Sequence, residues 1–236
     1  MLTMSHPLDN IALLPHVFAM DYDVIISGGG LTGIILALAL DQTGIRTAII
    51  DKNTPLVATN NIFDGRSYAI AAASQKMLNM LGLWKNLAKN AQPMLEIKVS
   101  DGYAGEVPSP FVMQFDRQDF TEGPMGYMIE DRHLRQVLQG ALKYSKVKFQ
   151  SNTQVLSQTV QPTHVAAKLN SGATITAAVL VGADGRTSNT AKTAGLTRSG
   201  WDYGQSSLVC VIAHEKPHNG IAHQYFMPSG PLAILP

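Results

Sequence analysis

Three glycines near the start of the chain are spaced as a phosphate-binding turn requires. Gly28, Gly30 and Gly33 form a G-x-G-x-x-G sequence, with Leu31 and Thr32 inside it. The first glycine of such a turn permits a tight bend, the second lets backbone approach a pyrophosphate, and the third allows a helix to pack against a strand. Because a helix N-terminus offers free N–H groups and a positive dipole end, the chemistry that these residues support is dinucleotide binding.

The elements around the glycines fit this interpretation. An apolar run ends at Ser27, an apolar helix is predicted after Gly30, and a second apolar run over 45–50 ends at Asp51, eighteen residues after Gly33. A carboxylate at that place can accept hydrogen bonds from an adenosine ribose. Lys52 follows directly and is a further candidate contact. The combination of strand, turn, helix, strand and acid favours a nucleotide site over a merely structural glycine turn.

A second candidate site follows another apolar run, over 179–181. This run ends at Gly182-Ala183-Asp184-Gly185, before a predicted helix. The arrangement puts a carboxylate and flexible backbone at the carboxyl end of a sheet, where open α/β sheets bind ligands. The alternative is that Asp184 only caps the helix.

Two arginines stand near predicted helix starts. Arg66 enters a small-residue stretch that is predicted to open an amphipathic helix ending near Leu81, with Gly82 as its stop. Its guanidinium could reach a phosphate or a flavin edge, or Arg66 could be an ordinary surface arginine. Arg132 follows Asp131, which is predicted to cap a helix.

The rest of the chain reads mainly as strands. They are expected at 96–100, 127–130, 147–149, 154–160, 164–169, 174–181, 206–214 and 221–226. A glycine- and proline-rich connection separates the first two and is typical of an excursion away from the nucleotide sheet. The chain stops at Pro236 inside an apparent sheet, so a fragment is expected.

Composition points to a small-molecule partner. The 18 basic and 17 acidic residues give no reason to expect nucleic acid. The lone Cys210 excludes an intramolecular disulfide, suits a reducing compartment and is expected to be a small buried residue on a strand. His214, His218 and His223 lack the tight spacing of a metal site, so no metal is expected and surface histidines are favoured.

No targeting segment is predicted. The uncharged span over 24–40 is shorter than the about 20 residues that cross a bilayer, and the first twenty residues lack a basic region. Residues 1–20 are predicted to be a disordered extension. Met20 is a hypothetical alternative start.

Together these residues resemble the class A flavoprotein aromatic hydroxylases, in particular the branch that hydroxylates ubiquinone precursors. The similarity spans 20–236. It implies that Gly28, Gly30, Gly33 and Asp51 bind the adenosine half of FAD, although many relatives carry glutamate at the last position. The segment Asp64-Gly65-Arg66 is similar to the family's Asp-x-Arg sequence, whose arginine lies beside the flavin.

The resemblance extends to the second candidate site. Arg132 is similar to a position that contacts FAD near the pyrophosphate. Asp184 and Gly185 match the family's Asp-Gly motif, which contacts FAD phosphate and serves the transient visit of NAD(P)H. The Ser-x-Val-Arg that usually follows is replaced by Ser188-Asn189-Thr190-Ala191, so the arginine contact is not carried over. A later Gly-Asp motif of the family lies beyond Pro236.

The implied activity is aromatic hydroxylation, in which NAD(P)H reduces FAD, O₂ adds at flavin C4a and the hydroperoxide transfers oxygen to a prenylated phenol. The flavin carries this chemistry, so no catalytic residue is assigned. Two alternatives stay open: another flavoenzyme, such as a prenyl reductase or dehydrogenase, and a catalytically incomplete binding or assembly subunit. The implied location is the cytoplasm, with peripheral contact to the inner membrane or a biosynthetic complex.

The predicted architecture is therefore α/β. A Rossmann-like FAD-binding domain is expected over 21–200, with an excursion at about 91–128 toward a second, sheet-containing substrate domain. That second domain begins at 201 and is incomplete at 236.

Overall fold

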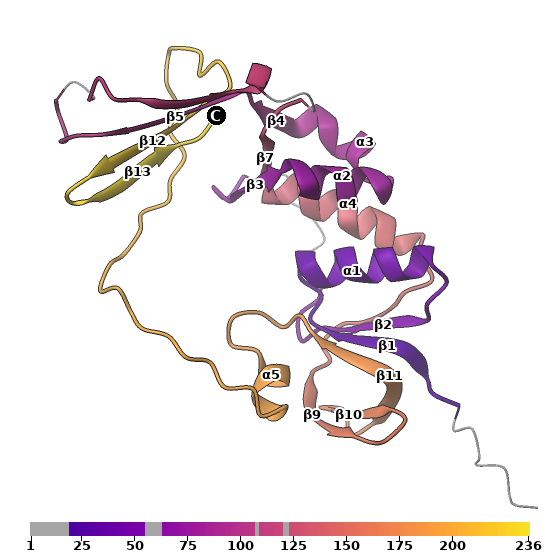
Figure 1. Cartoon of the computed structure of the whole chain (residues 1–236). Helices are drawn as coiled ribbons and strands as arrows, with labels where there is room; N and C mark the ends of the chain where they lie inside the picture. Colours follow the sequence, from indigo (N-terminus) through magenta and orange to yellow (C-terminus); the bar gives the residue numbers. More distant parts are fainter. Residues whose placement is uncertain (1–18, 55–62, 107–108, 120–122) are drawn as a thin grey trace, which may run out of the picture.

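Three β-sheets organise the chain in a computed structural model, which describes residues 19–54, 63–106, 109–119 and 123–236 (Figure 1). The largest sheet contains six strands, in the order β8 (Lys148–Gln150), β2 (Thr47–Ile50), β1 (Tyr22–Ser27), β11 (Thr174–Gly182), β10 (Val165–Leu169) and β9 (Val155–Val160). Strands β8, β2, β1 and β11 are parallel, whereas β10 and β9 are antiparallel to their neighbours. The carboxyl ends of the four parallel strands therefore meet at one edge of the sheet.

Apolar side chains cover both faces of this sheet. Because successive strand residues point to opposite faces, Ile26 and Ile25 enter different core clusters. The helices α1 (Leu31–Gln42) and α4 (Asp131–Lys143) pack against each other over the face of Ile26 (Figure 1). Their buried partners include Leu78 of α2 (Ala72–Met80) and Leu87 of α3 (Trp84–Leu87).

A three-stranded antiparallel sheet lies beyond these helices, in the order β3 (Ser67–Ala71), β7 (Gly126–Glu130) and β4 (Ala91–Met94). Its register pairs Ser67 with Glu130, and the next hydrogen bond runs from the Asp131 N–H to the Arg66 carbonyl at 2.9 Å. The start of β3 is thereby fixed beside the start of α4.

The third sheet joins distant parts of the chain. Its order is β13 (Gly230–Ile234), β12 (Ile221–Met227), β5 (Glu96–Asp101) and β6 (Met113–Asp116), and β5 pairs in parallel with β12. A long connection without helix or strand leads to β12 from α5 (Asn189–Thr193) (Figure 1). The single-turn helices η1 (Ala88–Asn90) and η2 (Arg117–Asp119) complete the described elements.

Most predicted elements are confirmed to within one or two residues, among them β1, β2, β5, β7, β8, β9, β10, β11 and β12. The predicted helix ending near Leu81 ends at Met80, and Gly82 follows with a φ of 72°. The overall α/β class with a Rossmann-like sheet is also confirmed. The division into two domains stays a prediction, and residues 1–18 of the predicted extension lie outside the described residues.

Two predicted elements are wrong. Residues 206–214 form no strand, and they are exposed throughout, including Cys210, which was expected to be buried. A continuous apolar run forms a strand only where a neighbouring strand satisfies the backbone, and no described strand pairs with this segment. Residues 67–71 are β3 rather than the start of a helix, because pairing with β7 overrides the small-residue pattern.

Candidate nucleotide-binding site

The glycine turn lies where β1 ends, between the ends of two neighbouring strands. The Gly28 N–H donates to the Ile50 carbonyl at 2.8 Å, and the Ala183 N–H donates to the Ser27 carbonyl at 2.7 Å. Gly28 has a φ of 111°, and a Cβ there would overlap the backbone of Ala183. The close approach of β11 therefore requires glycine at this position.

The other two motif glycines differ in what surrounds them. A Cβ on Gly33 would overlap the Gly28 carbonyl, so Gly33 permits the contact between helix and turn. A Cβ on Gly30 would meet nothing within 4 Å. The space above Gly30 is therefore open. Contact between the backbone and a diphosphate requires such an opening. The residues of the turn thus fit a dinucleotide cofactor.

Helix α1 begins at this opening. Gly30 is its N-cap without a side-chain cap, and the first intrahelical bond runs from the Ile34 N–H to the Gly30 carbonyl at 3.0 Å. The N–H groups of Leu31, Thr32 and Gly33 belong to the first turn, where helical N–H groups lack intrahelical partners. They can hold an anion together with the positive end of the helix dipole.

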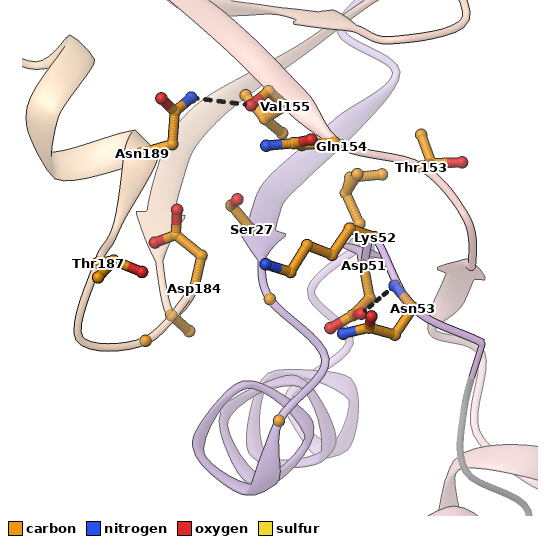
Figure 2. Close-up of a pocket in the computed structure, with 15 residues that line it drawn as sticks. Ser27, Asp51, Lys52, Asn53, Thr153, Gln154, Val155, Asp184, Thr187 and Asn189 are labelled. Atoms are coloured by element: carbon orange, nitrogen blue, oxygen red, sulfur yellow. Dashed lines mark hydrogen bonds between the residues drawn. The ribbon is translucent and has the colours of Figure 1, made fainter.

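Asp51 lies against the turn from the end of β2. Its Oδ2 accepts a hydrogen bond from the Gly29 N–H, and its Oδ1 accepts one from the Asn53 N–H at 2.7 Å. Each carboxylate oxygen can accept more than one hydrogen bond, so Asp51 can still meet a hydroxyl. Figure 2 shows the exposed Lys52 side chain directed into the same pocket.

Asp184 lines the pocket from the loop after β11. Its Oδ1 accepts from the Ser188 hydroxyl, and its Oδ2 accepts from the N–H and the hydroxyl of Thr190, each at 3.0 Å. Partial burial raises the pKa of this carboxyl, but the hydrogen bonds from Ser188 and Thr190 outweigh it and hold the pKa below its ordinary value. Gly185 follows with a φ of 89° and open space around its Cα.

Asp184 also stabilises α5, as the capping alternative proposes, because it accepts the Thr190 N–H in the first turn. The N-cap itself is Ser188, whose Oγ accepts from the Ala191 N–H at 3.0 Å. Thr190, at the valine position of the related motif, is 5% exposed. The unusual sequence after the Asp-Gly pair therefore fixes the carboxylate by local hydrogen bonds.

Sequence reasoning missed the far wall of the pocket. Asn189 donates from its Nδ2 to the carbonyls of Val155 at 3.2 Å and Leu156 at 3.1 Å, which ties α5 to β9 (Figure 2). The further lining residues not predicted are Ser27, Ile50, Asn53, Thr153, Gln154, Val155, Ala183 and Thr187. The signal that could have found several of them is the short gap between the predicted strands at 147–149 and 154–160, since it lies at the carboxyl end of a parallel strand.

Arg66 and Arg132 lie outside this pocket. Arg66 precedes β3, beside the start of α4, and Arg132 is in the first turn of α4. Arg66 Nη2 is 2.6 Å from Asp64 Oδ2 and 3.4 Å from Asp131 Oδ2. Arg132 pairs with Glu130, and its guanidinium lies 5.6 Å from the centre of the Phe63 ring. The structure thus places the predicted residues in two groups, one around the glycine turn and one at α4.

The prediction that Asp131 caps α4 is wrong. Glu130 occupies the N-cap position, and the Asp131 carboxylate points instead to Tyr68, Arg135 and Arg66. Two of these partners lie outside α4, far from Asp131 in the sequence. Rules for helix starts use only neighbouring residues, so they could not predict these contacts.

The three histidines named above are all exposed, and the rings of His214 and His218 lie 6.5 Å apart. Among residues 19–54, 63–106, 109–119 and 123–236, no group of three or more histidines, cysteines or carboxylates is placed to hold a metal ion. In that same part of the chain, every helix is too short or too polar to cross a membrane.

Comparison with known proteins assigns the chain to a family. The FAD binding domain family matches residues 21–229. The ubiquinone hydroxylase UbiL of Rhodospirillum rubrum is 39% identical over 217 residues, which are 91% of this chain and 49% of that protein. The 3-demethoxyubiquinol 3-hydroxylase of Escherichia coli is 30% identical over 218 residues, covering 91% of this chain and 54% of that protein. The chain thus spans about half the length of the curated relatives that it matches.

A solved structure agrees on the fold. The p-nitrophenol 4-monooxygenase PnpA of Pseudomonas putida aligns with a TM-score of 0.63 and 19% identity, over 76% of this chain and 45% of that one. With residues 21–229 matched and a glycine turn open for a dinucleotide, this chain belongs to the FAD binding domain family.

Proposed function

We propose that this chain forms the FAD-binding part of a monooxygenase that hydroxylates the aromatic ring of a polyprenylated phenol in ubiquinone biosynthesis. The observation that carries the proposal is the open space above Gly30. In the same turn, Gly28 has no room for a side chain, and the carboxylate of Asp51 accepts a backbone N–H. The first-turn N–H groups of α1 are therefore left for a ligand. The similarity to ubiquinone hydroxylases supports the substrate class.

Each residue of the pocket has a proposed role toward FAD. The first-turn N–H groups of Leu31, Thr32 and Gly33 hold the diphosphate at Gly30, and Asp51 accepts from the adenosine ribose. Lys52 supplies a positive charge in the same pocket, while Asp184 and Gly185 contact the cofactor from the opposite wall. Arg66 and Arg132 meet the cofactor at the start of α4.

The chemistry divides between cofactor and protein. FAD, when bound, supplies the transfer of electrons from NAD(P)H and the activation of O₂. The described residues contribute binding and orientation: the glycine turn fixes the diphosphate, and the bonds from Ser188 and Thr190 keep Asp184 ionised and in place. No side chain of this chain is required as a nucleophile.

The substrate proposal rests on relatives and on two short segments. Residues 99–102 and 230–236 are similar to the corresponding segments of 2-octaprenyl-6-methoxyphenol hydroxylase. They lie in β5 and β13 and their ends, which belong to the same sheet. An electron-rich phenol with a prenyl tail is the kind of substrate that this likeness supports.

A prenyl tail has a consequence for where the enzyme works. A substrate with a long apolar tail resides in a bilayer, so we propose a cytoplasmic enzyme that contacts the inner membrane peripherally. The test is co-sedimentation of full-length protein with liposomes and a comparison of turnover on prenylated and tail-less phenols. Equal turnover on both, without liposome binding, would contradict this part of the proposal.

The central experiment is the visible absorption spectrum of the purified chain before and after addition of FAD. Flavin bands that survive desalting are expected. Full-length protein given NAD(P)H, ¹⁸O₂ and a prenylated phenol should then yield a product with one labelled oxygen. A product without label would favour a reductase or dehydrogenase, and FAD binding without any turnover would favour a binding or assembly subunit.

A further inference from the structure

The start of α4 contains a buried carboxylate that the pocket of the glycine turn does not use. Asp131 is 3% exposed. Its Oδ1 accepts from the Tyr68 hydroxyl at 2.9 Å, and its Oδ2 accepts from Arg135 Nε at 2.6 Å. Arg66 Nη2 lies 3.4 Å from the same Oδ2. One carboxylate therefore joins α4 to β3 and to the residue before it.

Arg66 is the outward-facing member of this cluster. Its side chain is 51% exposed, compared with 25% for Arg135. Asp64 Oδ2 accepts from Arg66 Nε at 2.8 Å and from Nη2 at 2.6 Å. Within the described residues, Nη1 of Arg66 has no hydrogen-bond partner, so one edge of the guanidinium is fixed and the other edge is available.

Two carboxylates contact the same edge of this guanidinium, Asp64 at Nε and Nη2 and Asp131 at Nη2. Asp64 is exposed and belongs to the same short loop, whereas Asp131 is buried and belongs to a helix packed into the core. A buried ion pair adds little net stability compared with apolar residues, but it fixes geometry. Arg135 alone could balance the charge of Asp131. The additional contact with Arg66 therefore has another consequence: it attaches the exposed guanidinium of Arg66 to the core.

The anchor sets the place of Arg66 relative to the cofactor pocket. In Figure 1 the starts of β3 and α4 lie on the same side of the molecule as the start of α1, where the glycine turn is. Arg66 is nevertheless absent from the residues that line the pocket of Asp51 and Asp184. A ligand confined to that pocket would not reach Arg66, so only a ligand that extends beyond the pocket could meet it.

We propose that Asp131 is a positioning residue, which holds Arg66 so that its free guanidinium edge meets the part of FAD that extends beyond the pocket of the glycine turn. This inference rests on the proposed function, since it requires FAD in that pocket. It assigns Asp131 and Tyr68 no contact with the cofactor. Their effect passes through Arg66.

The test is a double-mutant cycle read by FAD affinity. The variants Asp131→Asn and Arg66→Gln should each weaken FAD binding by about tenfold, because each removes the positioned guanidinium edge that would donate a charge-assisted hydrogen bond to FAD. The double variant should bind no more weakly than Arg66→Gln alone, because both changes remove the same contact. The sign is informative: deleting a nearby negative charge would by itself tighten binding of an anionic ligand.

ADP serves as the second probe. It fills the adenosine part of the site, so its affinity should be the same in all these variants. The variant Asp131→Glu keeps the charge but displaces the carboxylate, so it should also weaken FAD binding. It provides the test if Asp131→Asn does not fold. The matched control is Asp23→Asn, which removes an ion pair with Arg46 at the opposite ends of β1 and β2 and should leave both affinities unchanged.

The outcomes separate the two proposals. FAD losses that multiply in the double variant, tighter FAD binding by Asp131→Asn, or an equal loss for ADP would overturn the positioning role while leaving the proposed function intact. Failure of the unsubstituted chain to bind either ligand would instead overturn FAD binding itself, and the positioning role with it.

Discussion

The glycines of the nucleotide turn have separable roles, and substitution can distinguish them. A Cβ at Gly28 or Gly33 meets backbone atoms, which cannot move aside as the end of a side chain can. A Cβ at Gly30 meets no protein atom. Two of these glycines are therefore required by close packing, whereas the role proposed for the third is to admit a ligand.

For Gly30→Ala we expect a free energy of unfolding within about 1 kcal/mol of the unsubstituted chain, together with a loss of FAD affinity of more than about tenfold. Gly33→Ala should destabilise the chain by about 1–3 kcal/mol or more, because its methyl group is forced against the Gly28 carbonyl. Urea unfolding measures the first quantity and flavin fluorescence the second. Unchanged FAD affinity in Gly30→Ala would show that the opening is not where the cofactor binds.

The lowered pKa of Asp184 makes a pH prediction. Since hydrogen bonds from Ser188 and Thr190 favour the ionised carboxylate in the folded chain, its folded pKa lies below the unfolded one. The stabilisation is therefore fully present above about pH 4, where unfolded aspartates are ionised, and is lost as pH falls through the folded pKa. Asp184→Asn should cost about 1–3 kcal/mol at pH 7.

The measurement is urea unfolding of both proteins between pH 7 and pH 3. The difference in their free energies of unfolding should shrink toward the acidic end. A difference that stays constant over the whole range would mean that ionisation of Asp184 does not matter for stability. The exposed pair of Asp23 and Arg46 offers a control, since its contribution should be small at every pH.

Among the elements, those with both a clear pattern and a local partner could be predicted from sequence. The strand β1, the turn and α1 are adjacent in the chain, and α1 begins directly after the glycines that its packing requires. Asp51 likewise follows β2 directly in the chain. The part of the pocket formed by the glycine turn and Asp51 was therefore predictable. Asn189 and Gln154 were not predicted, because they enter the site through the pairing of β11 and β8 with strands far away in the sequence.

The segment over 206–214 shows the opposite limit. Its apolar pattern predicts a strand, yet Leu208 is 97% exposed. Sequence pattern reports what a segment can bury, whereas a strand also needs a neighbour to bond with. The prediction that Arg66 enters a helix was wrong for a related reason. Only the pairing of β3 with β7 distinguishes that stretch from a helix start.

A pair of leucine substitutions tests this difference between elements. Leu138 of α4 is fully buried, so Leu138→Ala should lower the free energy of unfolding by about 2–5 kcal/mol. The same change at Leu208 should stay within about 0.5 kcal/mol. Both values come from urea denaturation of the whole chain. A comparable loss at Leu208 would show that 206–214 is packed as the sequence pattern predicts.

On the scale of the whole molecule, the C-terminal strands are held by pairing across a long distance in sequence. Six residues of β12 pair with β5, and the Gly220 carbonyl accepts from the Leu95 N–H at 2.8 Å. The connection over 195–219 is exposed along its whole length and contains no helix or strand. The hairpin of β12 and β13 is thus attached to the rest of the molecule twice, covalently through this connection and non-covalently through the pairing of β12 with β5.

Cleavage of the connection should therefore leave the molecule assembled. Limited digestion with chymotrypsin is expected to cut first near the exposed Trp201, Tyr203 or Leu208, since proteases prefer exposed segments without regular backbone hydrogen bonds. The two pieces should elute together in gel filtration and separate in urea, because the bonds between β12 and β5 hold them. The variant Gly220→Pro is the comparison. It removes no hydrogen-bond donor that β5 uses, but proline cannot adopt the native φ of 70°. After digestion, this variant should release the C-terminal piece. If the two pieces of the unsubstituted chain eluted separately in buffer, the pairing of β5 with β12 would not be what holds β12 and β13 in place, and the exposed connection would be their main attachment to the rest of the molecule.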